Sequence, residues 1–181
     1  MRICIDPGHS GPVEPGACAG GITEEAVNLA IALLVGSKLA AQGHDVIYTR
    51  SGDIHDDGLA FRAAIANDAA AHRFVSIHCN GAESPAAHGV EVFSYPGSAG
   101  GRLLAEAIQQ ELAAAAYTAD RGVKEADFAV LRLTDMAAVL VECGFLTSKS
   151  DRAVLASPSG QEMIAAAIAR GIVSSGETSF L

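Results

Sequence analysis

Two histidines in this chain stand where an imidazole is well placed to bind a ligand. His9 follows Pro7-Gly8, a pair that ends a short strand and holds the ring out of a sharp turn. His78 ends the mostly apolar run 74–77 with a polar side chain. A buried imidazole needs partners for its nitrogens, so a purely structural reason to end two strands with histidine is hard to find. The remaining histidines are expected to be surface residues or core residues with satisfied nitrogens: His44, His55, His72 and His88.

Glu24 adds a carboxylate to these two histidines. Two histidines and one carboxylate are the ligand set of many catalytic zinc sites, in which a fourth position stays open for water or substrate. Glu24 is followed by Glu25, however, and acidic residues at the start of a helix are also favoured by the helix dipole. The spacing leaves both interpretations open, because the three residues are spread along the chain and form no compact motif.

Glu142 is an acidic residue in an apolar setting, Val139–Phe145. A carboxylate there should be paired or functional, because burying an unpaired charge is costly. Burial raises the pKa of such a group, whereas a nearby zinc ion lowers it. In either case Glu142 is placed to take a proton from water and to pass it to a leaving nitrogen. The alternative is a buried salt bridge, for example to Arg132.

Strand-like and helix-like segments alternate along the chain, which predicts an α/β fold. The length, with no linker or internal repeat, favours a single domain with a twisted, mostly parallel (mixed) sheet flanked by helices. Ligands bind outside the carboxyl ends of strands in such sheets, where His9, His78 and Glu142 are expected. The expected strands are 2–6, 45–49, 73–78, 89–95 and 136–143, the expected helices are 24–42, 59–71, 98–116 and 160–174, and residues 7–23 and 176–181 are expected to form a long loop and a frayed tail.

The composition excludes several classes of function. Of the 181 residues, 12 are basic and 21 are acidic, giving a formal charge of −9, whereas nucleic-acid binders usually carry a basic patch. The same charge argues against binding to an anionic membrane surface. The chain has no tryptophan to build a base-stacking platform, and its longest apolar stretches are too short to span a bilayer. We therefore expect no nucleic-acid partner and no membrane insertion.

The four cysteines form no C-x-x-C pair, so a four-thiolate zinc site and a thioredoxin-like motif are not indicated. Cys4, Cys79 and Cys143 each lie among apolar strand residues, where a buried free thiol is the usual state. Cys18 lies in a glycine-rich loop, and the sequence leaves its state open.

Short motifs follow one another in order over nearly the whole chain. They are Ile3–Gly11, Gly16-Ala17, Glu24 with Asn28–Ala30, Gly43–Val46, Thr49-Arg50, Leu59–Arg62, Ala66-Asn67, Ser76–Asn80, Gly89–Phe93, Arg121–Lys124, Val130–Arg132 and Val139–Leu146. In this combination the sequence resembles the zinc-dependent N-acetylmuramoyl-L-alanine amidases of the Amidase_3 family. No single motif would be enough for this comparison.

The resemblance implies a role for each of the residues considered above. His9, Glu24 and His78 match the zinc ligands of the family, and Glu142 matches its catalytic glutamate. The implied reaction is hydrolysis of the amide between the lactyl group of N-acetylmuramic acid and the L-alanine of the stem peptide. In this scheme Zn²⁺ polarises the carbonyl and lowers the pKa of bound water to about 7, and Glu142 moves the proton. The departures from the family pattern, Ala138, Glu25 and Ser148, fall at none of these positions.

The resemblance also implies a partner and a place of action. Residues 1–175 would form the zinc amidase catalytic domain, with 176–181 as a flexible tail, and peptidoglycan would be the substrate at the cell wall. The amino terminus lacks the apolar region of a signal peptide, so we expect a phage-type release or a leader that has been removed. The oligomeric state is not indicated.

Two other functions remain possible for such a site. A zinc peptidase that cuts within the stem peptide would use the same ligands, and a wall-binding or regulatory module would keep the fold without the chemistry. The presence of Glu142 beside the three candidate ligands argues against the second.

Overall fold

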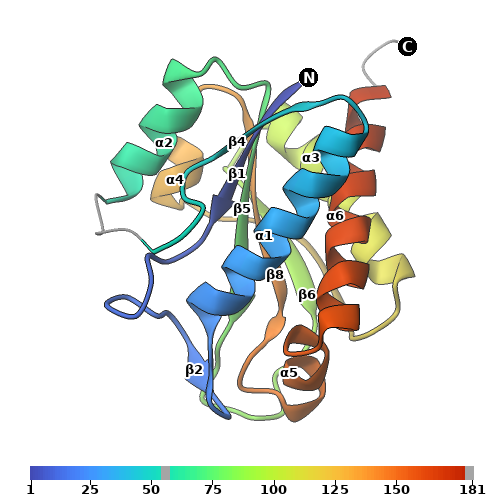
Figure 1. The fold of residues 1–181 in the computed structure, drawn as a ribbon. Coiled ribbons are helices and arrows are strands. Elements are labelled where there is room, and N and C mark those ends of the chain that lie inside the picture. Colours follow the sequence, from blue (N-terminus) through green and yellow to red (C-terminus); the bar gives the residue numbers. More distant parts are fainter. Residues whose placement is uncertain (54–57, 178–181) are drawn as a thin grey trace.

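A six-stranded mixed sheet forms the centre of the molecule, and helices lie on both of its faces (Figure 1). The computed structural model describes residues 1–53 and 58–177. Its elements, in chain order, are β1 (Arg2–Pro7), β2 (Cys18–Ala19), β3 (Ile22–Thr23), α1 (Glu24–Ala41), β4 (Asp45–Tyr48), α2 (Leu59–Asp68), β5 (Arg73–Asn80), β6 (Val90–Ser94), α3 (Ala99–Ala114), β7 (Asp120–Glu125), α4 (Ala129–Arg132), β8 (Ala137–Phe145), α5 (Lys149–Leu155) and α6 (Pro158–Glu177).

The strand order is β4-β1-β5-β8-β6-β7. The pairs from β4 to β8 are parallel, β6 runs antiparallel to β8, and β7 is parallel to β6. The predicted α/β class and the mostly parallel mixed sheet are therefore confirmed. Because β6 and β7 are reversed, their amino ends lie at the edge of the sheet where β1, β5 and β8 end.

The sequence missed the shortest and the most polar elements. The predicted loop 7–23 contains the small hairpin β2–β3, so that prediction was wrong for its second half. Strand β7 has the sequence Asp-Arg-Gly-Val-Lys-Glu, whose charges hide any apolar alternation at this edge of the sheet. Helices α4 and α5 are too short to show a helical period, although the Ser148 side chain caps α5 by accepting from the Asp151 amide.

The carboxyl-terminal helix is longer than predicted at both ends. Pro158 begins α6, a position where its missing amide and its fixed φ are tolerated. The helix continues to Glu177, so Gly176 and Glu177 are helical and do not belong to the predicted tail. The rest of that tail, 178–181, lies outside the described residues, as does His55.

The two faces of the sheet are covered unequally. Alternate residues of each strand point to opposite faces, so each face has its own apolar cluster. The long helices α1, α3 and α6 pack against one face (Figure 1), over side chains such as Ile5, Val75 and Val141. On the opposite face, the helices among the described residues that pack over Phe74 and Leu140 are α2, of 10 residues, and α4, of 4 residues. The described helices therefore leave part of this second face uncovered.

The predicted states of three cysteines are confirmed. Cys4, Cys79 and Cys143 are buried free thiols within these clusters, and Cys18 is free and exposed. Burial raises the pKa of the Cys4 thiol to about 12, and the nearby Asp6 adds to this effect. Such a thiol stays protonated and unreactive near neutral pH.

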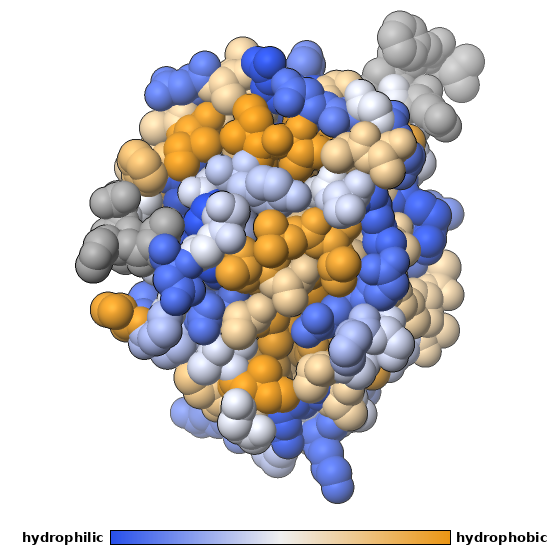
Figure 2. All heavy atoms as spheres, in the orientation of Figure 1, coloured by the Kyte–Doolittle hydropathy of each residue, from blue (hydrophilic) through white to orange (hydrophobic). Residues whose placement is uncertain are grey.

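The outer surface of the α1 and α6 side carries hydrophobic residues in separate groups, with hydrophilic residues between them (Figure 2). Scattered apolar side chains of this kind, such as Leu33 at 39% exposed, are common on folded proteins. Among the described residues, no helix combines the length and the apolar character that crossing a membrane requires.

Candidate active site

A cavity of about 550 Å³ opens on the face of the sheet that α2 and α4 only partly cover. Its lining comes from the carboxyl-terminal parts of β1, β5 and β8, the loop after β1, the start of α1, Leu59 and Arg62 of α2, and residues 128–130 at the start of α4. The position agrees with the general rule that ligands bind at the carboxyl ends of strands in α/β sheets. The lining includes all four predicted site residues: His9, Glu24, His78 and Glu142.

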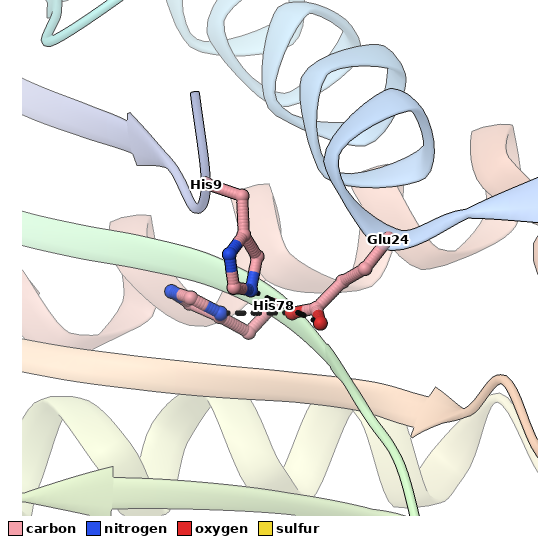
Figure 3. A group of neighbouring side chains, drawn as sticks. All are labelled: His9, Glu24 and His78. Carbon is pink, nitrogen blue, oxygen red and sulfur yellow. Dashed lines mark hydrogen bonds and ion pairs between the residues drawn. The ribbon is translucent and has the colours of Figure 1, made fainter. Parts of the chain in front are cut away.

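Three of these residues converge on one point, although they come from separate elements (Figure 3). His9 Nε2 lies 3.0 Å from Glu24 Oε2, and His78 Nδ1 lies 2.9 Å from Glu24 Oε1. One ligand atom from each residue lies within 4.8 Å of the others. Within the part of the chain that the structure describes, this is the cluster of His, Cys, Asp or Glu side chains able to hold a metal ion.

Glu24 is not an ordinary solvated residue at a helix start. Its side chain is 7% exposed, and its oxygens accept hydrogen bonds from the amides of Ala17 at 2.9 Å and Cys79 at 3.1 Å. Burial raises the pKa of Glu24, but hydrogen bonds from His78 and His9 outweigh burial and hold that pKa well below its usual range. The structure therefore favours the ligand interpretation over a helix-dipole contact.

Gly16 leaves space beside the donor atoms. Its φ is +67°, and a Cβ at this position would lie 2.5 Å from both Glu24 Oε2 and His9 Nε2. Any larger residue would occupy the space at which the ligand atoms point. Two imidazole nitrogens and one carboxylate oxygen around such a space fit the donor set that zinc takes in catalytic sites.

Glu14 holds His9 from the other side, a contact that the sequence analysis missed. The Glu14 carboxylate lies 2.5 Å from His9 Nδ1, because a tight turn with a hydrogen bond from the Glu14 amide to the Gly11 carbonyl folds the loop back. If Nδ1 donates its proton to Glu14, the lone pair of Nε2 is left for a metal. The sequence held one signal for this contact. Glu14 follows the candidate ligand His9 by five residues, in a loop whose prolines and glycines favour turns.

We expect Glu14→Ala to weaken zinc binding by about 10- to 100-fold, the usual effect of losing an outer-shell partner of a ligand histidine. Glu14→Gln keeps a hydrogen-bond acceptor and should retain most of the affinity. Competition with a chromogenic chelator would measure both constants. Equal zinc affinity in Glu14→Ala and wild type would contradict this role.

A buried ion pair fixes the loop that carries His9. Arg62 Nη1 lies 2.7 Å from Asp6 Oδ1, and both side chains are at most 5% exposed. Arg62 Nη2 also donates to the carbonyl of His9 at 2.6 Å, while Asp6 accepts from the hydroxyls of Thr49 and Ser76. These contacts hold His9 at φ 63°, a left-handed conformation that is uncommon for a residue other than glycine.

Arg62→Met should lower the free energy of unfolding by about 3–5 kcal/mol, because it leaves the Asp6 carboxylate buried without its partner. Chemical denaturation of the metal-free protein would measure the change. Arg102→Met is the matched control, since Arg102 pairs with Glu106 at the surface and such pairs contribute about 1 kcal/mol or less. Equal losses in the two variants would contradict the structural role of the Arg62 pair.

Glu142 lies beside His9, Glu24 and His78, and one of its carboxylate oxygens has no hydrogen-bond partner among the described residues. It lies opposite His78 in the register between β8 and β5, and its Oε2 is buried with no hydrogen bond to any described residue. Burial is the main cause that raises the pKa of Glu142 to about 7; neighbouring carboxylates add to this, and the two histidines oppose it. The alternative of a salt bridge to Arg132 is wrong, since Arg132 pairs with Asp127.

The other described histidines lie outside the site. His44 contacts the amino terminus, His72 accepts from the Arg2 amide, and His88 is bound to the Ala86 carbonyl. His72 and His88 are exposed and His44 is partly exposed, so none of the three is a buried core residue.

An α/β domain with two histidines and a carboxylate next to a glutamate whose Oε2 is buried and unpaired has the arrangement of a metal-dependent hydrolase. The family model for N-acetylmuramoyl-L-alanine amidases, Amidase_3, matches residues 3–174. The chain therefore belongs to the N-acetylmuramoyl-L-alanine amidase family, which is zinc-dependent.

Individual relatives and solved structures agree with this assignment. The chain is 40% identical to the uncharacterized protein YqiI of Bacillus subtilis, covering 94% of this chain and 82% of that protein. It is 41% identical to the amidase LytC of the same organism, covering 95% of this chain but only 35% of LytC. Among structures, the amidase AmiC2 of Nostoc punctiforme matches with a TM-score of 0.92 and 36% identity, covering 98% and 97% of the two chains. An amidase from Clostridium difficile 630 matches with a TM-score of 0.93 and 32% identity, also covering 98% and 97%.

Proposed function

We propose that this chain hydrolyses the amide bond between N-acetylmuramic acid and the L-alanine of the stem peptide in peptidoglycan, using a zinc ion held by His9, Glu24 and His78. The observation that carries the proposal is the convergence of these three side chains beside the unpaired Oε2 of Glu142 in one cavity. We assign the activity to residues 1–175 and its place of action to the cell wall.

The metal and the protein have separate tasks in this reaction. Zinc, when bound, supplies a Lewis acid that polarises the scissile carbonyl and makes a water molecule more acidic. His9 and His78 offer nitrogen ligands and Glu24 an oxygen ligand, while Glu14 fixes the ring of His9. Because these groups are already in place, little reorganisation is needed when substrate binds.

Glu142 moves the proton. Its carboxylate accepts a proton from the attacking water as the new C–O bond forms at the carbonyl carbon. It then gives that proton to the nitrogen of L-alanine as the C–N bond breaks, so the peptide leaves with a free amino group. Burial raises the pKa of Glu142 to about 7 and a bound cation lowers it, so the carboxylate can be ionised at neutral pH to accept the proton.

Analysis of the products from purified peptidoglycan tests the proposal. An amidase frees intact stem peptides with L-alanine at the amino terminus and leaves the glycan with a lactyl carboxylate. A zinc peptidase with the same ligands would leave L-alanine attached to the glycan, and a wall-binding module would release nothing. Either of these two results would overturn the proposed function.

A further inference from the structure

Two cationic side chains near the site share a single buried carboxylate. Arg121 Nε lies 2.6 Å from Glu91 Oε2, and the Lys124 ammonium binds the same oxygen. Glu91 is 4% exposed, whereas the side chains of Arg121 and Lys124 are 37% and 39% exposed. One cation would be enough to neutralise Glu91, so the cluster has a formal excess of one positive charge in a chain whose formal charge is −9.

The guanidinium of Arg121 is held in a fixed orientation. Its stem packs against Gly89, where a Cβ would lie 2.6 Å from Arg121 Cγ and Cδ. Its guanidinium carbon lies 5.0 Å from the centre of the Phe145 ring, and Nη1 donates to the His88 carbonyl at 3.3 Å. No hydrogen bond joins Nη2 to any residue that the structure describes, so N–H donors on the outer edge are left for a ligand.

The cluster adjoins the catalytic cavity. Glu91 lies directly opposite Glu142 in the antiparallel pairing of β6 with β8, and residues paired in this way project on the same face of a sheet. Asn80, which lines the cavity, donates to Glu91 Oε1 at 2.9 Å. The cations are therefore linked to the cavity through the residues Asn80 and Glu91.

We propose that Arg121 and Lys124 form a subsite that binds a free carboxylate of the stem peptide. The proposal rests on the proposed function and extends it, because the glycan backbone is uncharged while the peptide carries carboxylates. A guanidinium edge can bind a carboxylate with two parallel hydrogen bonds, and Lys124 adds a second charge. The motif Arg121–Lys124 has no role in the hydrolytic chemistry itself, and in this proposal it selects substrates whose peptide carries a free carboxylate.

The topology sets the distance between this subsite and the scissile bond. Arg121 lies on β7, three strands away from β5, and its guanidinium contacts Glu91 on β6, two strands away from β5. At about 4.8 Å between neighbouring strands, the guanidinium is about 10–14 Å from β5. An extended peptide advances about 3.3–3.6 Å per residue, so the bound carboxylate lies about three to four residues from the scissile amide.

A comparison of two substrates with wild type and Arg121→Gln tests the subsite. One substrate is a muropeptide with free peptide carboxylates, and the other has them converted to carboxamides. We expect KM for the free acid to rise about 10- to 100-fold in Arg121→Gln, the range for one hydrogen-bonded charge, with kcat nearly unchanged. The carboxamide substrate should show the same rise in wild type and no further rise in Arg121→Gln. Arg121→Lys should recover part of the affinity.

Controls separate this role from general damage and from failure of the proposed function. Arg102→Gln removes the same charge from an exposed pair on α3 and should leave both KM values unchanged. Binding of the free stem peptide, measured by calorimetry, requires no cleavage and tests the subsite even if the protein hydrolyses neither substrate. Equal dissociation constants of wild type for the acid and the carboxamide peptides would overturn the proposal.

Discussion

Glu142→Gln is expected to lower kcat by about 10²- to 10⁴-fold, the usual contribution of a general acid–base group. Glutamine has nearly the same shape as glutamate, so the strand β8 and the metal site should be unaffected. What is lost is the carboxylate that we propose accepts the proton of water and returns it to the leaving nitrogen. Steady-state release of peptide from a soluble muropeptide would measure the change, with zinc content determined on the same preparation.

The matched control is Glu106→Gln, which makes the same change at an exposed pair on α3. It should retain wild-type turnover. A Glu142→Gln enzyme with more than about a tenth of wild-type kcat would remove Glu142 from the proton transfer, since a general base contributes at least about 100-fold.

The pH profile of the wild-type enzyme should show the titration of the same group. A general base acts only when it is ionised, so kcat/KM should increase as the pH increases through the pKa of Glu142. Burial raises that pKa to about 7, and a bound cation lowers it, so the midpoint should lie at or below about 7. In Glu142→Gln the rise of kcat/KM with increasing pH that reports the titration of Glu142 should be missing.

The second large effect is expected at the metal site. His78→Ala removes one of the three proposed ligands and should reduce zinc from about one ion per chain to background, with loss of turnover. A ligand should matter more than the 10- to 100-fold in affinity that outer-shell changes cause. Elemental analysis of protein purified without added zinc would measure the content in wild type and variant in parallel.

His72→Ala is the control for this experiment, because His72 lies at the amino ends of the strands, where its Nδ1 accepts from the Arg2 amide. It should keep its zinc. If wild type holds no zinc even after the metal is supplied and the excess removed, the metal-dependent mechanism is wrong. A non-catalytic module would then be the better assignment.

Parts of the site were predictable because local sequence marks where strands end. A Pro-Gly pair precedes His9, and apolar runs lead to His78 and Glu142, so their common edge followed from the α/β pattern. The role of Glu24 did not follow, because a helix start explains an acidic residue equally well. Only the positions of the two imidazoles relative to its carboxylate distinguish the two interpretations.

Contacts between distant parts of the chain were beyond the sequence. Asp6 and Arg62 are 56 residues apart, and nothing near either one indicates that they meet. The position of the Glu91 carboxylate follows from the antiparallel pairing of β6 with β8, because this pairing brings Glu91 beside Glu142. Strand β7 was missed for a related reason. Its charged residue Lys124 pairs with Glu91 of the neighbouring strand β6, and the sequence of β7 alone does not reveal that partner.

The unequal covering of the sheet has a consequence for the kind of substrate that fits. Parallel sheets are normally enclosed by helices on both faces, whereas among the described residues only the short α2 and α4 pack against the second face of this sheet. Under the proposed function, the wall polymer covers the part of this face that the described helices leave open, and becomes a third layer there. A layer added from outside needs no free end to enter, so cleavage can occur anywhere along a continuous strand of wall material.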